Sequence, residues 1–137
     1  MSYDLMVFEK TKAPKTKDKF LEWFQEYSEW GGDPDHQNIG VASPALRNWF
    51  MEMKETFPPM NGEYAPDDDA LAADEGLESR MADYDIGQDI IYVAFAWSVA
   101  EEAYKQTLAL ARKHGVGLFN ASSDDGEIIL PDGSKLV

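Results

Sequence analysis

The stretch that most constrains the fold is the run from Ile90 to Trp97, in which every side chain is aliphatic or aromatic. A strand that is apolar on both faces needs cover on both, so it belongs inside a sheet rather than at its edge. The preceding stretch, Arg80 to Ile86, alternates apolar and polar residues, and Gly87-Gln88-Asp89 joins the two. The pattern predicts a β-hairpin whose second strand lies at the centre of a sheet.

Apolar residues at helical spacing predict three helices. The first covers about residues 18–30. The second follows Ser43-Pro44, where serine is a favourable N-cap and proline suits the first helical position, and it ends before a pair of prolines. The third opens with an S-x-x-E capping box, Ser98 to Glu101, and ends near residue 114.

Further strands are predicted at residues 3–9, 116–121 and 127–130, which makes the element order β-α-α-β-β-α-β-β. The strand, helix, strand unit over residues 90–121 predicts two strands that run parallel. We therefore expect an α+β fold, a two-layer ferredoxin-like variant with a mixed sheet and helices mainly on one face. Residues 1–137 are expected to form a single domain, with a long acidic surface loop at about residues 58–79 that contains one short helical turn at most.

Composition and charge exclude several classes of function. The chain has no cysteine, so it has no disulfide, zinc thiolate site or thiol nucleophile. Its formal charge of −14 repels phosphate backbones and anionic lipid, so we expect neither nucleic-acid nor membrane binding. No apolar run approaches the roughly 20 residues that span a bilayer. The start of the chain has no signal-peptide pattern, and we expect a cytoplasmic protein.

Negative charge is concentrated in one segment. Residues 63–89 carry ten acidic residues and one arginine, whereas residues 1–19 carry a net charge of +2. Solubility alone explains an acidic excess, but a dedicated basic partner would also be attracted to it. The first functional hypothesis is a protein-binding or regulatory module whose acidic face meets a basic protein, with these binding residues: Asp67, Asp68, Asp69, Asp74, Glu75 and Glu78.

The acidic segment also approaches the spacing of a calcium loop, with Asp67, Asp69, Glu75 and Glu78 at positions 1, 3, 9 and 12. Position 5 is a leucine and position 6 an alanine, where the loop needs an oxygen ligand and a glycine. A solvated run of charges explains the segment better, and we predict neither a metal site nor a cofactor.

No residue pattern points to catalysis. The sequence lacks a nucleophile elbow and a glycine-rich phosphate loop, and its histidines are His36 in a loop and His114 near a helix end. A helix C-terminus favours a charged imidazole, so a structural role suits His114. Acids at a sheet end, such as Asp4, Asp83, Asp85 and Asp89, could form a carboxylate site, although edge and turn positions explain them better. We predict no catalytic residues, and the sequence favours a binding protein over an enzyme.

Two alternatives remain open from the sequence. One is an enzyme or small-ligand receptor with a pocket under the Met60 to Gly62 loop, lined by Asn61, Tyr84, Trp97 and Asp4. The other is a structural subunit of a homo-oligomer, because the chain has more large aromatic residues than one small core must bury.

Four runs of sequence carry a resemblance: SYDLMVFE, FPPMNGEYAP, YDIGQDIIYVAFAWSVAEEA and HGVGLFNASS. Together they resemble a group of small acidic bacterial proteins that has no assigned activity. The resemblance covers nearly the whole chain and implies a bacterial origin, but it implies no catalytic residue. In size and acidity the chain also resembles immunity proteins of bacterial toxin systems, which implies a toxin-neutralising role.

Overall fold

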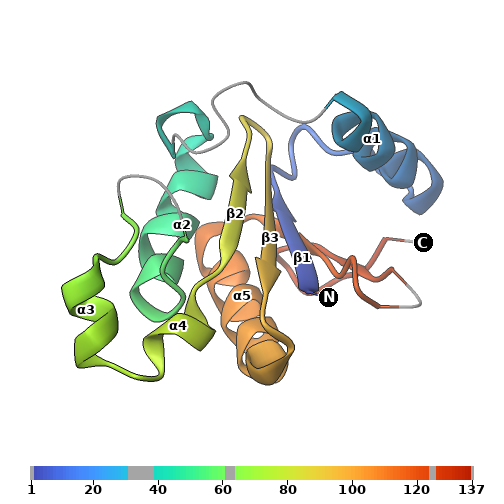
Figure 1. Cartoon of the computed structure of the whole chain (residues 1–137). Helices are drawn as coiled ribbons and strands as arrows, with labels where there is room; N and C mark the ends of the chain where they lie inside the picture. Colours follow the sequence, from blue (N-terminus) through green and yellow to red (C-terminus); the bar gives the residue numbers. More distant parts are fainter. Residues whose placement is uncertain (1, 31–38, 61–63, 124–125, 137) are drawn as a thin grey trace.

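Among the residues that the structure describes, five strands form one sheet in the order β2-β3-β1-β4-β5, with β1 in the centre (Figure 1). The computed structural model describes residues 2–30, 39–60, 64–123 and 126–136. The strands are β1 (Tyr3–Phe8), β2 (Asp83–Ile86), β3 (Ile90–Phe95), β4 (Gly117–Phe119) and β5 (Ile128–Ile129). The α-helices are α1 (Lys17–Trp30), α2 (Pro44–Thr56), α3 (Asp68–Ala73), α4 (Leu77–Arg80) and α5 (Ala100–His114), and the 3-10 helices are η1 (Ile39–Val41) and η2 (Trp97–Val99).

The predicted α+β class is confirmed, and the predicted elements occur in the predicted order with α3 and α4 added. The expectation of a mixed sheet was wrong, because every pairing between neighbouring strands is antiparallel. The reason is the position of β1. Strands β3 and β4 point the same way, as expected of a strand, helix, strand unit, but β1 lies between them and runs against both. Local patterns do not reveal such an insertion, because it depends on long-range pairing.

The two faces of the sheet are covered by different helices. Alternate residues of β1 and β3, such as Leu5 and Val93, belong to a core shared with α2 and α5. Their neighbours, such as Met6 and Ile90, belong to a second core with α1. Figure 1 shows α1 on the opposite side of the strands from α2. Two helices thus cover one face as predicted, and the aromatic side chains of α1 account for cover on the other.

One of the two predicted helix caps is present. The Ser43 hydroxyl accepts a hydrogen bond from the Leu46 amide at 3.3 Å and begins α2 as expected. The capping box at Ser98 was wrong, because residues 97–99 form η2 and the N-cap of α5 is Val99, which makes no side-chain cap bond. The backbone amide of Val99 already bonds the carbonyl of Ala96, so the chain turns into the helix one residue later than the sequence pattern suggests.

Candidate functional site

The segment predicted as a long acidic loop contains two short helices. Asp67 begins α3 by accepting a hydrogen bond from the Ala70 amide at 2.8 Å, and Asp74 follows the helix and accepts from the Gly76 amide at 3.0 Å. Asp68 and Asp69 fill the first turn, where the helix dipole favours negative charge. The acidic residues here therefore carry charge and also stabilise the start of a helix. This explains why the segment is helical where the sequence predicts a loop.

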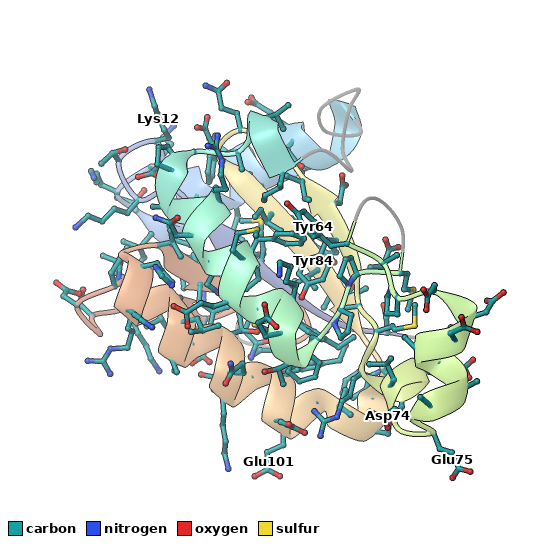
Figure 2. All side chains as sticks on the ribbon, turned by 90° about the vertical axis from the view of Figure 1, so that its left-hand side faces the viewer. Lys12, Tyr64, Asp74, Glu75, Tyr84 and Glu101 are labelled. Carbon is teal, nitrogen blue, oxygen red and sulfur yellow. The ribbon has the colours of Figure 1, made fainter. Side chains whose placement is uncertain are left out.

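All six predicted acidic-face residues are exposed on α3, α4 and their flanking turns. Figure 2 shows Asp74 and Glu75 at an outer edge of the molecule, with Glu101 of α5 along the same edge. Arg80 at the end of α4 pairs with Glu102 of α5 at 2.7 Å, and its guanidinium lies 5.9 Å from the centre of the Phe57 ring. The acidic surface (residues 67–80) is thereby attached to the body of the protein.

A shallow groove of about 340 Å³ borders the acidic surface. Apolar side chains make up much of its lining, including Met60, Met81 and Phe95, while Glu78 and Asp83 add carboxylates. Met60 is exposed to 46% and Trp97, just beyond the groove, to 50%. Among the described residues, these two are the most exposed of the large hydrophobic side chains. The groove therefore joins apolar contact area to negative charge.

The residues predicted to line a pocket are not brought together. Asn61 lies outside the described residues. Tyr84 is buried on the α2 and α5 face, where its hydroxyl donates to the Phe57 carbonyl at 2.7 Å. Asp4 points to the other face and accepts a hydrogen bond from Tyr92 at 2.6 Å. Trp97 packs against Tyr3, with ring centres 5.2 Å apart. Period-two alternation separates Tyr84 from Asp4, since they project from opposite faces of one sheet.

Three acidic residues of the sheet lie on one face of it. Ala94 of β3 is paired with Asp4 of β1 on one side and with Asp83 of β2 on the other, so both aspartates project from the same face as Ala94. Asp85 lies on the same face, opposite Tyr92. Asp89 is instead at the turn into β3, where its carbonyl accepts from the Glu9 amide. The hydrogen bond from Tyr92 and burial both raise the pKa of that tyrosine, with burial the larger cause.

A second cleft, of about 390 Å³, lies where β1 begins, β4 has ended and α5 starts. Its lining is Tyr3, Ala100, Glu101, Tyr104, Lys105 and Asn120. A polar network lies behind it. The Tyr104 hydroxyl donates to Glu127 Oε1 at 2.7 Å, and Lys135 Nζ lies 3.1 Å from Glu127 Oε2. Asn120 is nine-tenths buried, and its Oδ1 has no hydrogen-bond partner.

The network moves the pKa values of its members in opposite directions. Hydrogen bonds from Tyr104, and then from Lys135 and Asn120, lower the pKa of Glu127 against the effect of burial. Burial, followed by the bond to Glu127, raises the pKa of Tyr104 to about 12. Burial also raises the pKa of Tyr3, although a hydrogen bond with Asn120 partly offsets this. At neutral pH the cleft therefore has two neutral phenols in front of one ionised carboxylate.

Replacing Tyr104 by phenylalanine should raise the pKa of Glu127 toward its ordinary value, because Tyr104 is the largest cause of the lowering. A lowered carboxyl pKa stabilises the fold above the unfolded pKa, and this contribution disappears as pH falls through the folded pKa. The Tyr104→Phe protein should thus be less stable than wild type at pH 7 and converge with it in acid. NMR titration of the Glu127 carboxyl carbon measures the pKa, and urea denaturation at pH 7 and in acid measures the stability.

The control is Tyr64→Phe, at an exposed tyrosine remote from Glu127. An unchanged Glu127 pKa in Tyr104→Phe would show that the Tyr104 hydroxyl does not lower it.

His114, the histidine that the structure describes, pairs with a glutamate at the end of a helix. His36 lies outside the described residues. His114 ends α5 as expected, and its Nε2 lies 3.0 Å from Glu52 Oε1, which Lys113 Nζ also approaches at 2.6 Å. These partners, Lys113 first, lower the pKa of Glu52. In the described ranges no three histidines or acids are placed to hold a metal ion, and no helix there is long and apolar enough to cross a membrane.

No family model, curated protein or solved structure matches the chain significantly. What the protein does must therefore be inferred from its own surfaces.

Sequence reasoning missed the cleft at Tyr3, Tyr104 and Asn120. Its members come from three separate parts of the chain, and each one alone looks ordinary. Tyr104 lies within the third predicted helix, and Asn120 lies within the predicted strand at residues 116–121. One signal was present: Asn120 is the only polar side chain in residues 116–121. A buried amide in such a run must find partners or remain unsatisfied, and it therefore indicates a polar site.

Proposed function

We propose that this chain is a protein-binding module that presents the acidic surface and its bordering groove to a basic segment of a partner protein. The observation that carries the proposal is the combination of the two features. Exposed methionine and tryptophan side chains are typical of protein interfaces, and opposite charge around them selects the partner. Acidity alone would be explained by solubility.

The apolar part of the surface supplies a place for an anchor. Met60 and Met81 are flexible, polarisable side chains that adapt to an inserted apolar group. Trp97, half exposed and packed at a tilt against Tyr3, offers a rigid aromatic surface just beyond the groove. A partner segment that combines one or two apolar side chains with lysine or arginine fits this arrangement. Neutralisation of a basic toxin domain is one biological role that would use it.

The distribution of charge favours approach from one direction. Figure 2 shows Lys12 at the opposite end of the molecule from Glu75, and residues 1–19 have a net charge of +2 while the whole chain has −14. A basic partner is therefore drawn toward the acidic end, where complementary charge accelerates encounter. Salt at about 0.15 M shortens the range of this attraction to about 8 Å, so binding should weaken as salt rises.

The first experiment is affinity capture of the tagged protein from its native lysate at low and high salt, followed by binding measurements with the purified protein that is retained. We expect one basic protein, lost as salt rises. Replacing Asp68, Asp69 and Glu75 by lysine should weaken its binding at least tenfold and reduce the salt dependence. Asp67 and Asp74 are left in place because they stabilise the segment locally.

The matched control reverses three exposed acids away from the acidic surface: Glu22, Glu26 and Glu55. It changes the net charge of the protein equally, so a general effect of charge would weaken binding in both variants. Equal losses, or an unchanged salt dependence in the first variant, would count against a specific acidic face. Recovery of the chain alone would instead favour the homo-oligomer alternative, which sedimentation tests directly.

A further inference from the structure

The cleft formed by Tyr3, Ala100, Tyr104 and Asn120 has the size and the chemistry of a small-ligand site. Its volume of about 390 Å³ is within the range of pockets that hold small organic molecules, roughly 300 to 1,000 Å³. It shares no lining residue with the groove beside the acidic surface, although Trp97, which lies just beyond that groove, packs on Tyr3 of the cleft.

Asn120 is the residue that points to a ligand in the cleft. Buried polar atoms in folded proteins nearly always have hydrogen-bond partners, and a missing partner costs about 1–3 kcal/mol. Asn120 Oδ1 has none, although the residue is nine-tenths buried and lines the cleft. The oxygen is itself buried, and a ligand would reach it by rotation about the terminal torsion of asparagine, which is soft. A ligand that donates an N–H group would satisfy it.

The net charge of the chain favours a cation at the cleft. Glu101 at the mouth and Glu127 behind the wall are the acids near the site. Each forms an ion pair, with Lys105 at 3.1 Å from Glu101 and Lys135 at 3.1 Å from Glu127, so these four side chains add no net charge of their own. The net charge of −14 on the whole chain therefore sets the preference for a cation over an anion.

The walls favour a flat apolar body next to that cation. Tyr3 and Tyr104 present aromatic rings, and Trp97 packs behind the ring of Tyr3. Electron-rich aromatic faces attract ammonium groups, by about 0.5–1 kcal/mol at exposed sites and more where water is excluded. The methyl group of Ala100, in the first turn of α5, leaves room between them.

We propose that this cleft binds a small primary amine with an aromatic or similarly flat apolar body, whose ammonium group donates to Asn120 Oδ1 and whose body lies against Tyr3 and Tyr104. The amine is held by an acceptor oxygen, by the negative charge of the chain as a whole and by aromatic faces. A carboxylate of the same shape meets none of these favourably.

Three probes of one shape test the proposal on the full-length chain: phenethylamine, 2-phenylethanol and phenylacetate. NMR titration should show the amine shifting the resonances of Tyr3, Tyr104 and Asn120, with an affinity at least tenfold higher than that of the alcohol and no measurable binding of the acid. Equal affinities of amine and alcohol, tighter binding of the acid, or shifts confined to other residues would each overturn it.

Two variants connect the binding to the cleft. Asn120→Leu should reduce amine affinity at least tenfold and bring it close to that of the alcohol. Ala100→Leu fills the cleft from the start of a helix that tolerates leucine, and it should abolish binding even if Asn120→Leu folds poorly. Ala109→Leu, at an exposed position further along α5, is the matched control and should bind as wild type does. Unchanged amine binding in Ala100→Leu would place the ligand elsewhere.

Discussion

Replacing Trp49 by alanine should destabilise the protein by about 3–5 kcal/mol, the range for removing a large buried aromatic side chain. Trp49 is fully buried in α2 and belongs to the core that this helix shares with α5. Its indole Nε1 donates to the Thr107 carbonyl at 3.3 Å, and its ring lies 6.3 Å from that of Tyr84. Alanine would leave a cavity between two helices and the sheet, and the backbone can close it only in part.

Urea denaturation followed by tyrosine and tryptophan fluorescence measures the effect. A domain of this size has a total stability of about 5–15 kcal/mol, so the variant should unfold at a much lower urea concentration. Trp49→Phe should cost less, because it keeps most of the ring volume, and it provides a value if the alanine variant is too unstable. Met51→Ala is the control in the same helix, since Met51 is exposed and should matter by about 0.5 kcal/mol or less. A small cost at Trp49 would mean that α2 does not pack on α5 as described.

Replacing Gly117 by alanine should destabilise the protein by about 1–3 kcal/mol or more, through overpacking rather than through lost contacts. A Cβ atom at this position would overlap the ring of Phe8 on the neighbouring strand β1. The ring cannot move aside easily, because Phe8 is fully buried and its ring centre lies 4.8 Å from that of Phe20 and 6.3 Å from that of Trp23. Since the φ angle of Gly117 is not positive, backbone strain is not the cause.

A double-mutant cycle separates this clash from other effects. Phe8→Leu should cost stability alone, yet combined with Gly117→Ala it should cost less than the sum of the two single changes, because the smaller side chain makes room. Gly76→Ala is the control, as its nearest neighbour would be Asp74 Oδ1 at 3.5 Å, an ordinary contact. Additive costs in the cycle would refute direct contact between residues 8 and 117. Thermal or urea unfolding of the four proteins provides the measurement.

Much of the fold followed from local patterns. The apolar run after Gly87 identified β3 as an interior strand, and β3 lies between β2 and β1. Ser43 before Pro44 identified the start of α2. Local patterns gave the wrong prediction where the same few residues can form either of two local structures. Ser98 matched a capping box, but the turn at Trp97 to Val99 formed instead, and acidic residues expected in a loop became caps of short helices.

Of the candidate sites, one could be predicted from the sequence and another could not. The acidic surface was visible in the sequence because its charges are neighbours along the chain, and the structure added the apolar groove beside it. The predicted pocket mixed residues from both faces of the sheet. Tyr84 and Asp4 could be assigned to opposite faces only once the register of β2, β3 and β1 was known.

The sequence by itself determined the element types, their order and the location of the charge, because hydrophobic period, caps and composition act over a few residues. Only the tertiary structure decided that β1 separates β3 from β4 and that Tyr3, Tyr104 and Asn120 share one cleft with Glu127 behind it. These facts depend on contacts between residues as far apart as 3 and 120. Such contacts are selected by the free energy of packing the whole chain, which no short stretch of sequence contains.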